Sequence, residues 1–263
     1  MKIGIMNKGI GHLPFEELVL LCKEIGATGV QPFITGGAIS PVMTKTQRKA
    51  AAAFLKEQHI DLPAVCADFG AGFFSEENNE GSIHRLIAMI DLAVDLGTNI
   101  VSTHIGHIPD DENDPVYQKK LETFKIVGKY ADDLGVYLAA ETGRETPEVL
   151  KKFLLNTGCK SAAVNLDPAN LAMCIGADPV EAVYILGDLI VHTHVKDGIK
   201  TGETTYMETP LGEGSVDFPR YLKALQDIGY DGYLTIERGG GEDRVAEIRK
   251  AFDFIREELR NLQ

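Results

Sequence analysis

The chain of 263 residues lacks the features that mark several large classes of protein. Cysteine is scarce and scattered, so neither a disulfide framework nor a thiolate zinc knuckle is expected. The four cysteines are Cys22, Cys66, Cys159 and Cys174. Free thiols fit a reducing compartment, and we expect a cytoplasmic protein. No apolar stretch is long enough for a transmembrane helix, and the glycine-rich N-terminus does not resemble a signal peptide.

Positive charge is also scarce. The chain has 26 Lys and Arg residues against 39 Asp and Glu residues, which gives a formal net charge of −13. This charge repels phosphate backbones and no local basic patch offsets it, so we expect no nucleic-acid partner. No GxGxxG motif follows the first apolar run, which argues against a dinucleotide-binding fold. Because no linker or shift in composition interrupts the chain, we predict one domain over residues 1–263.

A unit of one helix and one strand recurs along the chain. An amphipathic stretch ends at a glycine, as at Gly26, Gly97 and Gly135, and a short β-branched run follows. Glycine after a helix commonly adopts the left-handed conformation, and a buried parallel strand reads as a near-continuous apolar run. One unit departs from this rule, with Gln58 and His59 at the place where a glycine is expected.

The repeated unit predicts the fold class. Eight strands alternating with helices in one α/β chain of this length indicate a single closed (β/α)8 barrel, the TIM barrel, rather than an open doubly wound sheet. The last helix is expected from about Glu242 onward. The predicted strands are Lys2–Met6, Gly29–Phe33, Leu62–Ala67, Asn99–His104, Val136–Glu141, Ala162–Asp167, Ile190–Val195 and Tyr233–Glu237.

Three long loops are predicted after strands, on the rim where the active sites of such barrels lie. They are Asp68–Gly81, His107–Pro115 and Asp197–Phe218. The glycines of the sequence LGEGS in the third loop could cradle a phosphate. However, the neighbouring carboxylates make that loop acidic, and no phosphate-loop motif of the GKS type is present, so a phosphate site there is weakly supported.

Four consecutive apolar runs end in a polar side chain, namely Glu141, Asp167, His194 and Glu237. The ends of adjacent parallel strands converge at one rim of a barrel. Three carboxylates at one place would raise each other's pKa unless a cation offset their charge. The set therefore predicts a divalent metal site with three oxygen ligands and one nitrogen ligand. His192 faces the same side as His194 one layer deeper, either as a core histidine or as support for a ligand.

Five further residues are candidates for substrate binding. His104 and His107, in the sequence STHIGHIP, could each bond a substrate hydroxyl, or one of them could hold a metal ligand in place. Asn170 could contact substrate or cap a helix. Lys196 reaches the cavity or pairs with a nearby acidic residue. Cys66, at the end of the third strand, is expected in the pocket wall, with no basic partner that would activate it.

Glu141 and Glu237 are expected on opposite sides of the ion. One carboxylate can then remove a proton from a carbon beside a carbonyl while the other returns a proton, and the ion stabilises the enediolate. Return on the opposite face gives epimerisation, and return to the neighbouring carbon gives aldose–ketose isomerisation. A sugar-binding barrel without catalysis is the alternative from another functional class.

The sequence also resembles a known family. The motifs HTHVKD, DPAN and PLGEGSVDFPRYLKALQDIGYDGYLTIER, with the glutamate that closes the fifth strand, resemble the xylose isomerase-like TIM-barrel superfamily of sugar (phosphate) isomerases and epimerases. The resemblance implies a metal ion (manganese, cobalt, magnesium or zinc) held by Glu141, Asp167, His194 and Glu237, with proton transfer by the two glutamates. It also implies a small-molecule sugar or sugar-phosphate substrate and a homo-oligomer, either a dimer or a tetramer.

The sequence departs from particular branches of that superfamily. Ketose 3-epimerases carry an arginine just after the seventh strand, where this chain has Lys196-Asp197-Gly198, and a histidine at the position of Asn170. The substrate is therefore left open, and an inosose dehydratase-like lyase is an alternative. The apurinic-site endonucleases of the superfamily use three zinc ions and several more histidines. Their extra aspartate and histidine before the GEG turn are replaced here by residues such as Tyr206 and Glu208, and Asn170 again replaces a ligand histidine, so a DNA-repair enzyme is not expected.

Overall fold

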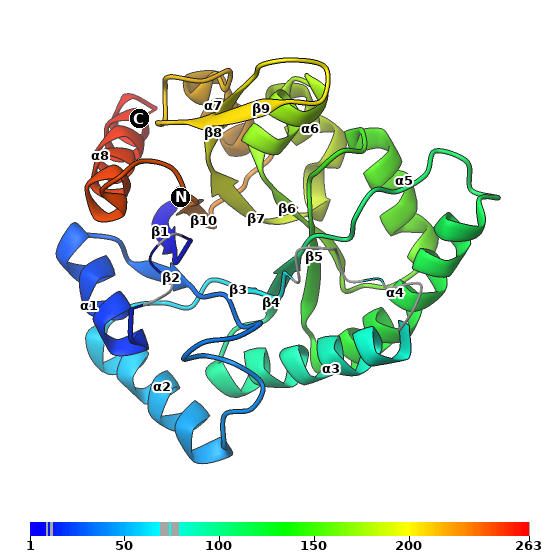
Figure 1. Cartoon of the computed structure of the whole chain (residues 1–263), viewed down its shortest axis with the longest axis horizontal. Helices are drawn as coiled ribbons and strands as arrows, with labels where there is room; N and C mark the ends of the chain where they lie inside the picture. Colours follow the sequence, from blue (N-terminus) through cyan, green and yellow to red (C-terminus); the bar gives the residue numbers. More distant parts are fainter. Residues whose placement is uncertain (9, 11–12, 69–73, 75–78, 263) are drawn as a thin grey trace.

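The computed structural model describes residues 1–8, 10, 13–68, 74 and 79–262 (Figure 1). Eight parallel strands form one sheet in the order β2-β1-β10-β7-β6-β5-β4-β3. Parallel bridges Gly29↔Asp61 and Phe33↔Cys66 join the two ends of this order and close the barrel, as predicted. The strands are β1 (Lys2–Met6), β2 (Gly29–Gln31), β3 (Val65–Cys66), β4 (Ile100–Thr103), β5 (Tyr137–Glu141), β6 (Ala162–Leu166), β7 (Ile190–Val195) and β10 (Tyr233–Ile236).

The helices form a ring around the strands (Figure 1). They are α1 (Phe15–Ile25), α2 (Lys45–Gln58), α3 (Asn79–Leu96), α4 (Pro115–Leu134), α5 (Pro147–Thr157), α6 (Pro179–Leu186), α7 (Phe218–Asp227) and α8 (Arg244–Asn261), with short helical turns η1 (Asn170–Ile175) and η2 (Gly187–Leu189). No helix within the described residues is both long enough and apolar enough to cross a membrane.

The ends of the helices follow the glycine rule. Gly26 and Gly135 lie after α1 and α4 with φ of 101° and 67°, in the left-handed conformation that glycine adopts without strain. The exceptional unit ends at His59, which adopts the same conformation with φ of 57°. The backbone N–H of His59 bonds to carbonyl oxygens of α2, so a histidine here performs the role of the glycine.

Polar side chains meet inside the barrel. Gln31 on β2 contacts Ser102 on β4 as well as His192 and His194 on β7. Neither β4 nor β7 is a sheet neighbour of β2, so these contacts cross the interior. All four residues are at most 1 % exposed, and each polar atom that crosses the barrel therefore needs a partner.

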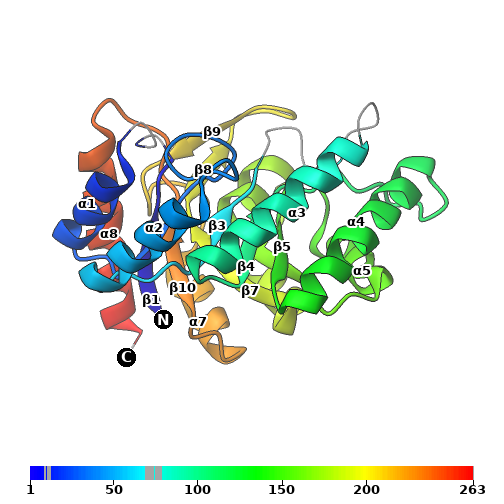
Figure 2. The same cartoon turned by 90° about the horizontal axis from the view of Figure 1, so that it is seen from below.

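The segment Asp197–Phe218 is not only a loop, and the prediction is wrong for two stretches of it. Strands β8 (Asp197–Lys200) and β9 (Tyr206–Thr209) pair as an antiparallel hairpin. Figure 2 shows this hairpin at one end of the barrel and both chain termini toward the other. The predicted loop His107–Pro115 is confirmed up to the first residue of α4, whereas most of Asp68–Gly81 lies outside the described residues.

The Asp197 side chain takes up the backbone N–H groups of the glycine-rich turn after β9. Its carboxylate accepts backbone N–H groups of Gly198, Gly212, Gly214 and Val216, at 2.8 to 3.1 Å. A cluster of backbone N–H groups is the usual way to bind an anion, and the chain supplies that anion itself. Glu208 on β9 similarly accepts N–H groups of Gly239 and Gly240.

Candidate metal centre and its cavity

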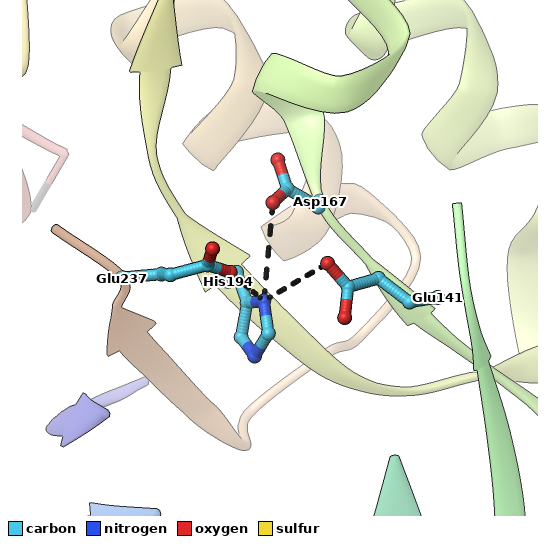
Figure 3. Close-up of side chains that lie close together, drawn as sticks. All are labelled: Glu141, Asp167, His194 and Glu237. Carbon is cyan, nitrogen blue, oxygen red and sulfur yellow. Dashed lines mark ion pairs between the residues drawn. The ribbon is translucent and has the colours of Figure 1, made fainter. Parts of the chain in front are cut away.

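The four predicted ligands converge at one end of the barrel (Figure 3). Glu141 ends β5, His194 lies near the end of β7, and Asp167 and Glu237 follow β6 and β10 directly. One ligand atom from each of them lies within 4.8 Å of those of the others. All four side chains are at most 5 % exposed. The strand-end pattern in the sequence therefore corresponds to one buried cluster.

The imidazole of His194 is at the centre of this cluster. Its Nδ1 lies 2.7 Å from Glu237 Oε2, 3.6 Å from Glu141 Oε1 and 3.9 Å from Asp167 Oδ2. Figure 3 shows Glu141 and Glu237 on opposite sides of the ring, with Asp167 between them. Nδ1 is therefore the nitrogen that faces the three carboxylates.

The cluster is strongly coupled electrostatically. Burial lowers the pKa of His194, but the Glu141 and Glu237 carboxylates outweigh it and hold that pKa well above its usual value. Burial raises the pKa of Asp167 and of Glu237, but Lys196 and His194 outweigh it and lower both. In each case nearby opposite charge overcomes the desolvation of a buried group.

Two lysines offset part of the negative charge. Lys196 Nζ lies 3.2 Å from Asp167 Oδ2 and 3.1 Å from Glu237 Oε1, and Lys8 Nζ pairs with Glu237 Oε1. The donor set of three carboxylates and one imidazole nitrogen fits manganese, cobalt, magnesium or zinc, because carboxylate oxygens suit magnesium and manganese, and mixed imidazole and carboxylate ligands suit zinc and other transition metals. The residues present therefore fit a divalent ion.

A cavity of about 520 Å³ opens beside the cluster. Glu141 lines it, and so do four of the five predicted substrate-binding residues. These four are His104, His107, Asn170 and Lys196. Whether they contact a substrate stays a prediction.

Three of these wall residues also touch carboxylates of the predicted metal ligands. His104 Nε2 lies 3.6 Å from Glu141 Oε1, and Asn170 Nδ2 donates to the same oxygen at 3.1 Å. Asn170 Oδ1 accepts from Lys196 Nζ at 3.1 Å. The backbone N–H of Asn170 bonds to Asp167, so the residue belongs to a helical turn and to the cavity wall at once.

Cys66 is not brought to the cavity wall. It is buried at the end of β3 and is absent from the described residues that line the cavity. Burial raises the pKa of its thiol far above the usual value, and the charge of Glu141 adds to this effect. The sequence predicts that no basic partner activates Cys66, and the raised pKa of the thiol agrees with this prediction.

Several residues of the site were missed in the sequence. Lys8, Arg144, Glu145 and Tyr206 line the cavity but lie in loops or in the hairpin, where no periodic pattern marks them. Burial raises the pKa of Glu145, which is only 5 % exposed. Gln31 could have been found, because it ends the apolar run GVQ in the same way that Glu141 ends its strand.

The hairpin is joined to the segment that carries Glu237. Glu208 pairs with Arg238 Nη1, and Arg238 Nη2 bonds to Glu247 Oε2 at 3.0 Å. Glu208 also holds the backbone of Gly239 and Gly240. Arg238, which directly follows the predicted ligand Glu237, is thereby fixed to Glu208 on the cavity wall.

Fold and site together define a (β/α)8 barrel with a candidate divalent-metal centre at its rim. The family model described as xylose isomerase-like TIM barrel matches residues 19–258, and the chain belongs to that family. Eight parallel strands, the closure of the barrel and the rim position of the acidic cluster agree with this membership.

Relatives of this chain include proteins named as an epimerase and as a dehydratase. Fructoselysine 3-epimerase of Shigella flexneri is 25% identical over 265 residues and covers 90% of each chain. Inosose dehydratase of Lacticaseibacillus casei is 25% identical over an alignment of 153 positions that covers 50% of this chain and 48% of that protein.

Solved structures confirm the fold. A xylose isomerase domain protein from Planctomyces limnophilus has a TM-score of 0.87 at 22% identity and covers 99% of this chain and 97% of that one. An L-ribulose 3-epimerase has a TM-score of 0.81 at 18% identity, covering 99% and 95%.

Proposed function

We propose that this protein is a divalent-metal-dependent isomerase that epimerises or isomerises a sugar or sugar phosphate. The observation that carries this proposal is the buried cluster of three carboxylates and one imidazole beside a cavity of about 520 Å³. Related proteins that are named as epimerases support the reaction class. A cytoplasmic location and a homo-oligomer stay predictions of the sequence.

Glu141 and Glu237 are the proposed proton carriers. They lie on opposite sides of His194 (Figure 3), so one can take a proton from a carbon beside the substrate carbonyl and the other can return one. A bound divalent ion would supply Lewis-acid stabilisation of the negative charge on the substrate oxygens. Asp167 and His194 would hold the ion and take no part in proton transfer.

The wall residues would orient the substrate. Asn170 and His104 contact Glu141, so a sugar hydroxyl bound by either one would lie next to the proposed proton carrier. Lys196 lines the same cavity and contacts Glu237. Substrate binding and the positions of the two glutamates are therefore linked through these three residues.

Arg144 would decide between a sugar and a sugar phosphate. It is exposed on the cavity wall and forms no ion pair within the described part of the chain. A hydrogen bond to a charged group is worth about 1.5–3 kcal/mol, so Arg144→Gln should raise KM for a phosphorylated ketose by about tenfold or more. Unphosphorylated ketoses should be unaffected. Equal behaviour of both substrates would exclude Arg144 as a phosphate contact.

The reaction is tested by proton exchange with solvent. The manganese- or magnesium-loaded protein is incubated in deuterated water with ketopentoses and ketohexoses, with and without a terminal phosphate, and followed by NMR. Deuterium at the carbon beside the carbonyl without loss of water supports the isomerase. Loss of water would favour the lyase related to the inosose dehydratases, and binding without either change would favour a sugar-binding barrel.

Variants assign the proton carriers. Glu237→Gln should keep the fold and lose turnover, because an amide cannot accept the proton. Glu213→Gln is the matched control, since it removes an exposed carboxylate on the rim outside the cluster. Full activity of Glu237→Gln would refute the role of Glu237.

A further inference from the structure

Gln31 forms a hydrogen-bonded connection from the wall of the barrel to the candidate metal centre. Its Oε1 lies 3.0 Å from His194 Nε2 and 3.2 Å from His192 Nε2, and its Nε2 donates to Ser102 Oγ at 2.9 Å. Ser102 Oγ in turn donates to the carbonyl oxygen of Val65 at 3.4 Å. These residues come from strands β2, β3, β4 and β7.

The direction of every hydrogen bond in this chain follows from its first member. A backbone carbonyl such as that of Val65 can only accept, so the Ser102 hydroxyl is the donor of this bond and uses its single proton for it. The Ser102 oxygen is then left as an acceptor for the amide –NH2 of Gln31. Gln31 must therefore turn its carbonyl oxygen toward the two histidines, and both must donate to it from Nε2.

We propose that Gln31 is a positioning residue that holds His194 in the tautomer with its proton on Nε2. Nδ1 then keeps its lone pair, and Nδ1 is the nitrogen that faces Glu141, Asp167 and Glu237. A histidine that binds a metal almost always donates from its other nitrogen to a fixed acceptor, and this bond sets both the tautomer and the plane of the ring. The proposal rests on the metal centre proposed above.

Asn165 also borders the ring of His194. Its Nδ2 lies 3.2 Å from His194 Nε2, and its Oδ1 has no hydrogen-bond partner among the described residues. With the proton on Nε2, an amide turned by 180° would bring Oδ1 next to that N–H. In that orientation Asn165 Oδ1 would share the Nε2 proton with Gln31 Oε1, and the amide would no longer donate to Glu141 Oε2. Because Asn165 Nδ2 also lies 3.5 Å from His194 Nδ1, the choice of tautomer rests on Gln31.

The tautomer can be read directly by NMR. Protein labelled with ¹⁵N at histidine and loaded with zinc, which is diamagnetic, is examined with long-range ¹H–¹⁵N correlation. We expect His194 Nε2 to carry the proton and Nδ1 to be the metal-bound nitrogen, and His192 Nε2 to be protonated as well. A proton on His194 Nδ1 with zinc on Nε2 would overturn the proposal.

The hydrogen-bonded connection from Ser102 through Gln31 to His194 is called the relay below. Ser102→Ala tests its direction without removing Gln31 Oε1, the acceptor. Loss of the hydroxyl leaves the Gln31 –NH2 group free to turn toward the histidines, and removal of such outer partners typically lowers metal affinity by about 10–100-fold. Gln31→Leu should lower zinc affinity at least as much. Ser161→Ala is the matched control, because Ser161 is also a buried serine that donates to a backbone carbonyl, but at the opposite end of β6.

The outcomes separate the relay from the metal centre. Zinc titration of the wild type and the three variants is read by calorimetry, without any substrate. If the wild type binds no zinc, the metal centre fails. If it binds zinc and Ser102→Ala binds it equally well with an unchanged histidine spectrum, the relay is refuted while the metal centre stands. Weaker binding by Ser102→Ala and Gln31→Leu but not by Ser161→Ala supports the relay.

Discussion

Replacing Asp197 by asparagine should loosen the rim beside the cavity. Oδ1 accepts from Gly198 and Val216, and Oδ2 accepts from Gly212 and Gly214. Asparagine keeps one oxygen and replaces the other with an –NH2 group, which cannot accept a hydrogen bond. Two backbone N–H groups therefore lose their acceptor and face another donor.

The expected cost follows from these contacts. Hydrogen bonds to charged groups contribute about 1.5–3 kcal/mol each, so two lost bonds correspond to about 3–6 kcal/mol. Gly212 is exposed, so water can replace part of its loss. We therefore expect the free energy of unfolding to fall by about 3 kcal/mol, the lower end of that range. For a chain of this size each kcal/mol lowers Tm by about 2–4 °C, which gives a decrease of about 6–12 °C.

Urea unfolding of Asp197→Asn and wild type, with Glu213→Gln as a control on the same turn, measures this cost. Metal affinity should be unchanged because the four ligands are intact. KM for the substrate should rise, since the hairpin brings Tyr206 and Glu208 to the cavity. A difference in unfolding free energy below about 0.5 kcal/mol would refute the reasoning, because only surface substitutions fall in that range.

Three further predictions follow from the same contacts. Gly214→Ala should destabilise the same turn, because its Cβ would lie 2.0 Å from Asp197 Oδ1, and thermal unfolding measures the loss. Manganese at 100 times its Kd should raise the free energy of unfolding by about 2.7 kcal/mol, a shift that a Glu141→Gln variant should reduce and calorimetry can check. Tyr233→Phe removes a hydrogen bond to Asp61 and should cost about 1 kcal/mol at neutral pH. The Tyr233 hydroxyl lowers the pKa of Asp61 below its ordinary 3.8, so this stabilisation is present above that pH and is lost as pH falls through the lowered pKa. Urea unfolding at pH 7 and pH 3 should show the cost shrinking; an equal cost at both would contradict the assignment.

The repeated pattern of glycine-ended helices and apolar runs predicted the barrel. The ends of two strands nevertheless differ from the predicted ends, and the reason is physical. β2 ends at Gln31 because Pro32 follows, and the ladder of β3 begins only at Val65, after Pro63. Proline has no N–H to donate to a neighbouring strand, so an apolar run that contains it extends beyond the hydrogen-bonded strand. Hydropathy alone does not report this difference.

The metal ligands could be predicted because strand geometry brings the ends of consecutive runs together. The residues around them could not, because their positions depend on tertiary contacts. Arg144 and Glu145 follow β5 in a loop without periodicity, and the hairpin depends on Asp197 gathering backbone N–H groups from residues up to 19 positions away. Lys8 reaches Glu237 across 229 residues of sequence, a pairing that no local pattern encodes.

The two proposed proton carriers have unequal surroundings, and the difference gives Lys196 its significance. Glu141 lines the cavity and is contacted by the amide of Asn170, whereas Glu237 is contacted by two ammonium groups and is absent from the described residues of the cavity wall. Lys196 lines the cavity and touches Glu237, so it connects the two. Any substitution of Lys196 therefore changes the wall that binds substrate and the charge that favours ionised Glu237 together. Substrate preference and proton transfer cannot be altered independently at this position.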